Sequence, residues 1–249
     1  MVETVVITGM GHGLGRAIAL EFADTAETIV GCGRSVAPLQ EVRDEIRADH
    51  EAHAEHVRCD VTVQADREYF LRKFDGYLGA DATIDLLVPC AAVNHGQSGR
   101  TQLHTESYSH FEKHMETNAG GVFAFVKEVH DRLSEDARIL VPTQAVARDG
   151  TRGYGSYAVS KAAVEAVARG FAADLVDTTV GCLEFELLAT RLHTLDTDRI
   201  ATGGLDPAEA AEMVSWAATE LDSEDLDGQI VTMDEWREET DRLEEQEAQ

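Results

Sequence analysis

The sequence predicts a single α/β domain built on a doubly wound parallel sheet. Short runs rich in Val and Ile alternate with longer amphipathic runs along the whole chain, and no low-complexity linker or repeat interrupts them. Strand-like runs separated by helix-length segments are typical of crossover connections between parallel strands. With 249 residues, the chain is long enough to bury the core of one such domain.

The elements follow one another in a regular order. We expect strands at residues 3–8, 27–32, 56–59, 84–89, 138–143, 178–185 and 229–233. We expect helices at residues 14–24, 37–50, 64–78, 105–132 (with a break near 117–119), 155–175 and 207–220. The domain is expected to span residues 1–233, and the strongly acidic stretch 234–249 is expected to form a frayed or partly helical tail.

The charge of the chain is strongly negative. Its 47 acidic residues outnumber 21 basic ones, which gives a net charge of −26. This spread of acidic residues along the whole chain resembles the composition of proteins from salt-loving cytoplasms. There, concentrated salt screens the repulsion between the negative charges. Such a surface argues against binding to nucleic acids or anionic membranes. No apolar run approaches the ~20 residues that span a bilayer, and no basic segment precedes the first strand, so we expect a cytoplasmic protein.

Cysteine and histidine spacing indicates neither a metal site nor a disulfide framework. The cysteines are scattered through apolar runs without CxxC spacing, which favours buried thiols. They are Cys32, Cys59, Cys90 and Cys182. His50, His53 and His56 could share one face of the expected helix, but nothing nearby supplies further ligands, and a solvated face explains them better.

A glycine-rich turn, Thr8-Gly9-Met10-Gly11-His12-Gly13-Leu14-Gly15, follows the first strand and opens an Ala-rich helix. Glycines permit a tight turn and let backbone N–H groups approach a pyrophosphate at the positive end of the helix. The turn therefore predicts a dinucleotide site. Its expected contacts are Gly9, Gly11, His12, Gly13, Leu14 and Gly15.

The ends of the next two strands suggest which dinucleotide binds. After the second strand, where an acidic residue would accept the ribose hydroxyls, the chain has Arg34, which can pair with a 2′-phosphate. A loop-capping role for Arg34 is the alternative. Asp60, followed by Val61 at the end of the third strand, could accept from an adenine amino group or cap the next helix. The presence of Arg34, where an acidic residue would otherwise be expected, favours NADP(H) over NAD(H).

Tyr157 and Lys161 lie four residues apart on an expected helix, so their side chains share one face. An ammonium beside a phenol favours the phenolate and lowers a pKa that is ordinarily ~10. A tyrosine in that setting can donate or accept a proton near neutral pH. Alone, such a pair is also common on exposed helix faces.

Taken together, these motifs make the chain resemble the short-chain dehydrogenase/reductase family over nearly its whole length. The matching features are the glycine turn, Asp60 after the third strand, Asn118 in Met115–Gly120, Tyr157 with Lys161, and Thr190 after the sixth strand. The resemblance implies a Rossmann-like domain with a seven-stranded sheet and NAD(P) across its carboxyl edge. It also implies that Ala91 contacts the cofactor and that Thr190 lies near the nicotinamide carboxamide.

The resemblance also implies roles in catalysis. Tyr157 would be the general acid/base, Lys161 would hold the ribose hydroxyls and lower the tyrosine pKa, and Asn118 would anchor a water that relays protons. The chain departs from the family at a serine that donates a hydrogen bond to the substrate oxygen. That position is Gln144, preceded by Thr143, and either side chain could supply the donor.

Other departures lie close to the cofactor. Pro89-Cys90-Ala91-Ala92 replaces the family's usual Asn-Asn-Ala-Gly after the fourth strand, Phe185-Glu186 replaces a Pro-Gly, and Glu235-Trp236 replaces a Gly-Gly.

The leading interpretation is an NADP(H)-dependent oxidoreductase that interconverts a small carbonyl and an alcohol. The alternative is a catalytically impaired dinucleotide-binding protein that acts as a sensor or subunit. Relatives commonly form homodimers or homotetramers through the helices expected at 105–132 and 155–175. The short, polar segment 188–205 suggests an open pocket for a small or polar substrate.

Overall fold

The computed structural model describes residues 2–96, 98–190, 192 and 204–247. Seven strands form one parallel sheet in the order β3-β2-β1-β4-β5-β6-β7. The strands are β1 (Thr4–Thr8), β2 (Thr28–Gly33), β3 (His53–Arg58), β4 (Ile84–Pro89), β5 (Leu133–Thr143), β6 (Thr178–Glu184) and β7 (Ile230–Thr232). The predicted fold class, a doubly wound parallel sheet, is confirmed.

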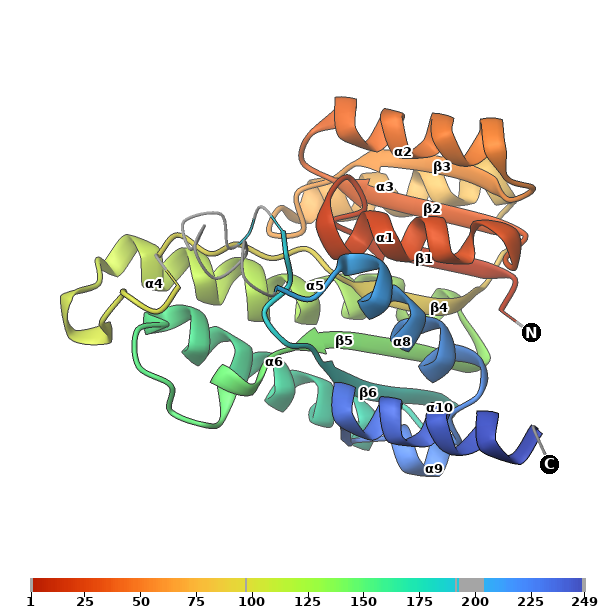
Figure 1. Cartoon of the computed structure of the whole chain (residues 1–249). Coiled ribbons are helices and arrows are strands. Elements are labelled where there is room, and N and C mark those ends of the chain that lie inside the picture. The colour runs from red at the N-terminus through yellow and green to blue at the C-terminus, as the bar shows by residue number, and fades with distance from the viewer. Residues whose placement is uncertain (1, 97, 191, 193–203, 248–249) are drawn as a thin grey trace.

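Helices cover both faces of the sheet (Figure 1). The longer ones are α1 (Gly13–Glu21), α2 (Val36–Asp49), α3 (Gln64–Leu78), α5 (Gly121–Val129), α6 (Gly155–Asp174), α8 (Pro207–Thr219) and α10 (Met233–Glu247). Shorter helical segments are η1 (Phe22–Asp24), η2 (Leu103–Thr105), α4 (Tyr108–His114), η3 (Met115–Gly120), η4 (His130–Arg132), η5 (Ala145–Ala147) and α9 (Ser223–Leu226). Within the described ranges, no helix combines the length and apolar character needed to span a bilayer.

Alternate residues of the buried strands face two separate apolar cores. In β1, Val5 and Ile7 pack with α1, α2 and α8 on one face, whereas Val6 packs with α3, α5 and α6 on the other. This arrangement follows from the two-residue period of a strand whose two faces are both covered. The sheet is thereby held rigidly, with the carboxyl ends of all its strands along one edge.

The strand order reverses between β1 and β4, which are neighbours in the sheet although β2 and β3 lie between them in the chain. Ligands of open α/β sheets bind at such a switch point, outside the carboxyl ends of the strands. The first turn after β1 and the loop after β4 therefore face one another there.

The break expected near residues 117–119 is a π-helical turn, η3, between α4 and α5. Such turns are frequent at functional sites because they displace backbone groups from the regular helical pattern. The trio of His50, His53 and His56 does not lie on one helix. His50 follows α2, and the other two lie in β3, which begins earlier than expected. The described residues contain no group of side chains suited to hold a metal ion.

The acidic C-terminal stretch, which was expected to be frayed or partly helical, is an α-helix as far as Glu247. Thr232 and Glu235 form a capping box, in which the Glu235 N–H donates to Thr232 Oγ1 and the Thr232 N–H donates to Glu235 Oε2. Val231 and Trp236 flank the box and are both buried in the same core. Packing therefore continues past residue 233, where the domain was expected to end.

Replacing Trp236 with Ala should lower the free energy of unfolding by about 3 kcal/mol, because a buried indole leaves a cavity when removed. Trp236→Phe is the matched control. It keeps most of the apolar ring and removes an N–H that has no partner among the described residues, so it should cost less than about 1 kcal/mol. Urea denaturation in molar salt measures both. A loss below about 1 kcal/mol for the alanine variant would mean that α10 is not anchored to the domain.

Candidate functional site

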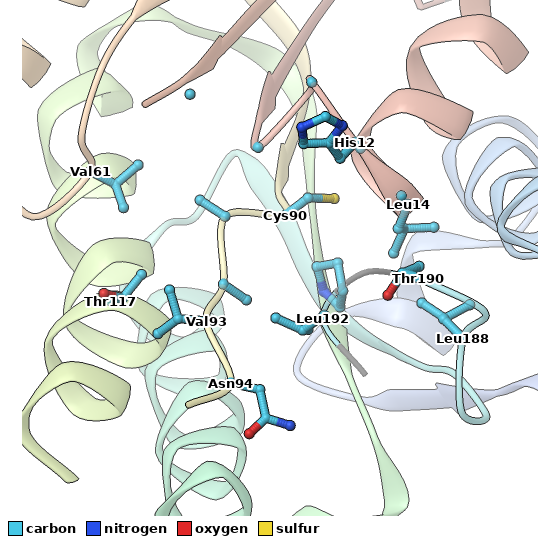
Figure 2. A pocket seen from close by; sticks show the side chains of 18 of the residues that line it. His12, Leu14, Val61, Cys90, Val93, Asn94, Thr117, Leu188, Thr190 and Leu192 are labelled. Carbon is cyan, nitrogen blue, oxygen red and sulfur yellow. The ribbon is translucent and has the colours of Figure 1, made fainter. Parts of the chain in front are cut away.

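A cavity of about 470 Å³ lies at the switch point, along the carboxyl edge of the sheet. The β1–α1 turn, the ends of β2 and β3, and the loop after β4 form one part of its lining. The end of β5, the first turns of α6 and the segment after β6 form the rest. Figure 2 shows His12 and Leu14 of the first turn, Cys90, Val93 and Asn94 of the β4 loop, and Leu188, Thr190 and Leu192 after β6 around it.

The glycine turn brings backbone, not side chains, to the cavity. Gly9 has a φ of +74°, and a Cβ atom there would lie 3.0 Å from the Ala91 nitrogen. Gly13 has a φ of +54°, and a Cβ atom would lie 3.0 Å from Thr190 Cγ2. Any larger residue would therefore be strained and would close the gap between the turn and its neighbours. The first turn of α1 presents N–H groups without intrahelical partners to this space.

Nearly all the residues predicted to contact a cofactor line this one cavity. They are Gly9, Gly11, His12, Gly13, Leu14, Gly15, Arg34, Val61, Ala91, Tyr157, Lys161 and Thr190. Arg34 is exposed and forms no ion pair with any described residue, whereas Arg16 is paired with Glu45 at 2.6 Å. Arg34 is thus the cation of this region that is available to a ligand.

Asp60 differs from the other predicted contacts because it is not part of the lining, although Cys59 and Val61 on either side are. Its Oδ1 accepts from the N–H and the hydroxyl of Thr62, at 3.1 and 2.8 Å. Asp60 therefore stabilises the turn after β3. The next helix, α3, begins only at Gln64, so Asp60 does not cap it.

Tyr157 and Lys161 are both buried at the base of the cavity, on the same face of α6. The Tyr157 hydroxyl donates to Gln144 Oε1 at 2.8 Å. The Lys161 ammonium donates to the Pro142 carbonyl at 2.9 Å and lies 5.9 Å from the centre of the Tyr157 ring. The expected pair is therefore assembled, with each polar end held by the end of β5.

Burial has a larger effect on Tyr157 than the neighbouring cation. Desolvation, with a smaller contribution from Tyr154, raises the pKa of Tyr157 above its ordinary value. The expectation of a lowered tyrosine pKa is thus wrong for this structure. Burial also lowers the pKa of Lys161 to about 8, because desolvation disfavours its charged form. The phenol at this site is therefore protonated at neutral pH.

Gln144 and Thr143 both border the cavity but have different partners. The Thr143 hydroxyl donates to Glu165 Oε1 at 2.8 Å, and Arg148 also binds that carboxylate. Gln144 instead contacts the Tyr157 hydroxyl through Oε1, and its Nε2 makes a long bond of 3.3 Å to the Glu186 carbonyl. Gln144, not Thr143, thus directs its polar group at the tyrosine.

Asn118 joins three elements through its carboxamide, from the π-helical turn η3. Its Oδ1 accepts from the Val93 N–H at 2.8 Å, and its Nδ2 donates to the Val93 carbonyl and to Ser160 Oγ at 3.0 and 2.9 Å. Ser160 Oγ in turn donates to the Tyr157 carbonyl at 2.7 Å. The loop after β4 is thereby tied to α6. A bond of 3.0 Å from the Ala91 N–H to Thr8 Oγ1 ties the same loop to β1.

A second buried polar group, not expected from the sequence, lies beside Tyr157. His114 is fully buried, and its Nδ1 lies 2.6 Å from Ser156 Oγ. Glu106 accepts the Ser156 N–H at 2.6 Å and so caps the start of α6 from a distant loop. The His114 Nε2 accepts the His95 N–H at 2.9 Å. These residues are far apart in sequence, and no local pattern identifies them.

The lining of the cavity contains no Asp or Glu among the described residues, although 47 of the chain's residues are acidic. Its charged members are Arg34 and Lys161. A polyanionic dinucleotide, which the surface of the molecule as a whole repels, thus meets a cavity of opposite sign. Together with the glycine turn, this lining fits a nicotinamide dinucleotide.

The family model described as short chain dehydrogenase matches residues 3–196. The chain belongs to this family, whose members are oxidoreductases that use a nicotinamide cofactor and act on small carbonyl or alcohol substrates.

Proteins similar to this chain include ones described with NADPH or an NADP derivative and one described with NADH. An NADPH-dependent aldehyde reductase 2, chloroplastic, of Arabidopsis thaliana is 26% identical over 204 residues, which cover 76% of this chain and 74% of that one. An alcohol dehydrogenase from the archaeon Thermococcus sibiricus, complexed with 5-hydroxy-NADP, has a TM-score of 0.79 at 24% identity and covers 94% of this chain and 96% of its own. A 3-ketoacyl-(acyl-carrier-protein) reductase from Brucella melitensis, complexed with NADH, has a TM-score of 0.80 at 21% identity, with coverage of 93% and 96%.

The buried His114 should make stability depend on pH. Burial lowers its pKa from 6.5 to about 4, so the unfolded state binds more protons between these values and stability falls as the pH falls. Between pH 7.5 and pH 5 the loss from this group should be about 2 kcal/mol.

Urea denaturation of the wild type and of His114→Gln at the two pH values measures this loss. The variant should lack about 2 kcal/mol of the wild-type pH dependence. His104→Gln, which removes an exposed histidine, is the control and should keep the wild-type slope. Equal slopes in the wild type and His114→Gln would contradict the assignment.

Proposed function

We propose that the protein is an NADP(H)-dependent reductase of small carbonyl compounds. The observation that carries this proposal is the placement of Tyr157, Lys161 and Gln144 in one acid-free cavity with the glycine turn and Arg34. Proton-handling and polyanion-binding groups thus meet at the switch point of the sheet, where a dinucleotide fold binds its ligand.

The bound nicotinamide would supply the hydride, and the chain's own residues would supply the proton. Tyr157 would donate its hydroxyl proton to the carbonyl oxygen of the substrate. The hydroxyl is protonated at neutral pH, as donation requires, and the burial that raises its pKa makes it a weaker acid, which the neighbouring cation would have to offset. Lys161, whose ammonium lies beside the ring, would stabilise the phenolate that remains.

Gln144 would complete the site in place of a serine. Its amide already contacts the tyrosine hydroxyl, and a rotation of the carboxamide would present Nε2 to the same oxygen that Tyr157 protonates. A donor at that point stabilises the charge that develops on the oxygen. The Thr143 hydroxyl is occupied by Glu165, which supports Gln144 as the donor.

Arg34 would select the phosphorylated cofactor. It lines the cavity at the end of β2, where a ribose 2′-phosphate would need a cation, and it has no carboxylate partner among the described residues. Gly33 before it and Ser35 after it also line the cavity, so the chain approaches a ligand closely here.

The outer faces of α5 and α6 support self-association as a homodimer or homotetramer. Phe123 of α5 is 49% exposed and stacks on Phe171 of α6, with ring centres 5.9 Å apart. Exposed aromatic pairs of this kind favour burial against a second subunit.

Tyr157→Phe should reduce the kcat for aldehyde reduction by at least about 10³-fold, because it removes the proton donor. The dissociation constant of NADPH should change by less than about threefold, since the ring remains in place. Stopped-flow or steady-state oxidation of NADPH with a panel of aldehydes and ketones measures the first, and cofactor fluorescence measures the second. Tight NADPH binding without turnover of any carbonyl by the wild type would contradict the reductase proposal.

Arg34→Ala should raise the Kd of NADPH by about tenfold or more and leave that of NADH within about twofold, because only NADPH carries the 2′-phosphate. Fluorescence titration of both cofactors at one fixed salt concentration measures the ratio. Arg16→Ala is the matched control, since Arg16 is paired with Glu45, and should leave the preference unchanged. An unchanged NADPH/NADH ratio in Arg34→Ala would refute the assignment.

A further inference from the structure

His95 is a cavity residue that neither the fold nor the proton-transfer chemistry requires. It lies in the loop after β4, next to Asn94, and both line the cavity (Figure 2 shows Asn94). The loop passes from the cofactor-contacting Ala91 towards α4, so His95 borders the same cavity beyond the expected cofactor contacts.

The position of the His95 ring is set by its neighbours. Its backbone N–H donates to His114 Nε2, and this bond requires the neutral His114 ring to carry its proton on Nδ1, facing Ser156 Oγ. The His95 ring is stacked on that of His110, with ring centres 5.5 Å apart and an angle of 23°, and the His114 ring lies at the same distance. The imidazole is therefore held in place before any ligand binds.

The ring nitrogens of His95 form no hydrogen bond with any described residue. After burial, Lys113, His110 and Arg34 lower the pKa of His95. In a chain of net charge −26, His95 thus lies near two cationic side chains, Lys113 and Arg34, at the edge of a cavity whose described lining contains no Asp or Glu.

We propose that the substrate of this protein is a carbonyl compound that carries a carboxylate, and that His95 binds this carboxylate. This inference rests on the proposed reductase function and names the substrate class of the same cavity. A neutral imidazole N–H donates to a carboxylate, and the bound anion then favours the protonated ring, which strengthens the bond. The Lys113 ammonium, which disfavours a proton on the free His95 ring, would stabilise the bound anion.

The test compares 4-carboxybenzaldehyde with methyl 4-formylbenzoate, which has nearly the same shape and no charge. Binding to the complex with NADP⁺ is measured by calorimetry, and turnover is measured separately with NADPH. The wild type should bind the carboxylate about tenfold more tightly than the ester, the range expected for a hydrogen bond to a charged group. His95→Gln should remove most of this preference and leave binding of the ester within about twofold.

Two further variants keep the test independent of folding defects. Lys113→Gln changes an exposed residue and should lower the carboxylate preference in the same direction by a smaller factor. His104→Gln, an exposed histidine outside the cavity, should leave the preference unchanged.

Equal binding of the two aldehydes by the wild type would overturn the inference, as would an equal loss for both in His95→Gln. A changed NADPH affinity in His95→Gln would also overturn it, because His95 would then serve the cofactor. Carboxylate preference in binding without turnover would support the anion site and refute the reductase function instead.

Discussion

The site depends on the hydrogen bonds of the Asn118 carboxamide. It satisfies both backbone polar groups of Val93 and donates to Ser160, whose hydroxyl holds the carbonyl of Tyr157. All of these groups are buried, so loss of one partner would leave several polar atoms without hydrogen bonds in a dry interior. One side chain therefore fixes the distance between the loop after β4, which borders the cavity, and the helix that carries the tyrosine.

The shape of the cavity depends on these hydrogen bonds, and its preference for a ligand depends on where the charges of the chain lie. The β4 loop, held at Val93 and Ala91, presents Cys90 to His95 along one wall of the cavity. The glycine turn forms the opposite wall. It lies so close to the β4 loop that a Cβ atom added at Gly9 would be 3.0 Å from the Ala91 nitrogen. The chain is strongly acidic, but no Asp or Glu among the described residues lines this space, so the cavity is suited to a polyanion. Shape and charge thus favour the same class of ligand.

The fold and most of the residues that line the cavity were predictable because they depend on local sequence. Strand and helix periods, the glycine turn and the Tyr157–Lys161 spacing are all properties of short segments. The helical C-terminus could have been predicted from the capping box of Thr232 and Glu235, flanked by Val231 and Trp236. Asp60 was ambiguous because a helix cap and an adenine contact use the same carboxylate, and in the structure its Oδ1 instead accepts from Thr62 in the turn after β3.

The sequence by itself determined which residues can carry the chemistry: a phenol, an ammonium, an amide in place of a serine hydroxyl, and an arginine after β2. Only the tertiary structure decided how they behave. Burial raises the pKa of Tyr157 despite the nearby lysine, because desolvation depends on everything packed around a group. Thr143 bonds to Glu165 while Gln144 contacts the tyrosine, because adjacent residues of a strand end face opposite sides. A hydrogen-bonded cluster likewise forms only after the chain has folded, because no short-range pattern connects residues so far apart. Its members are Glu106, His114, Ser156 and His95.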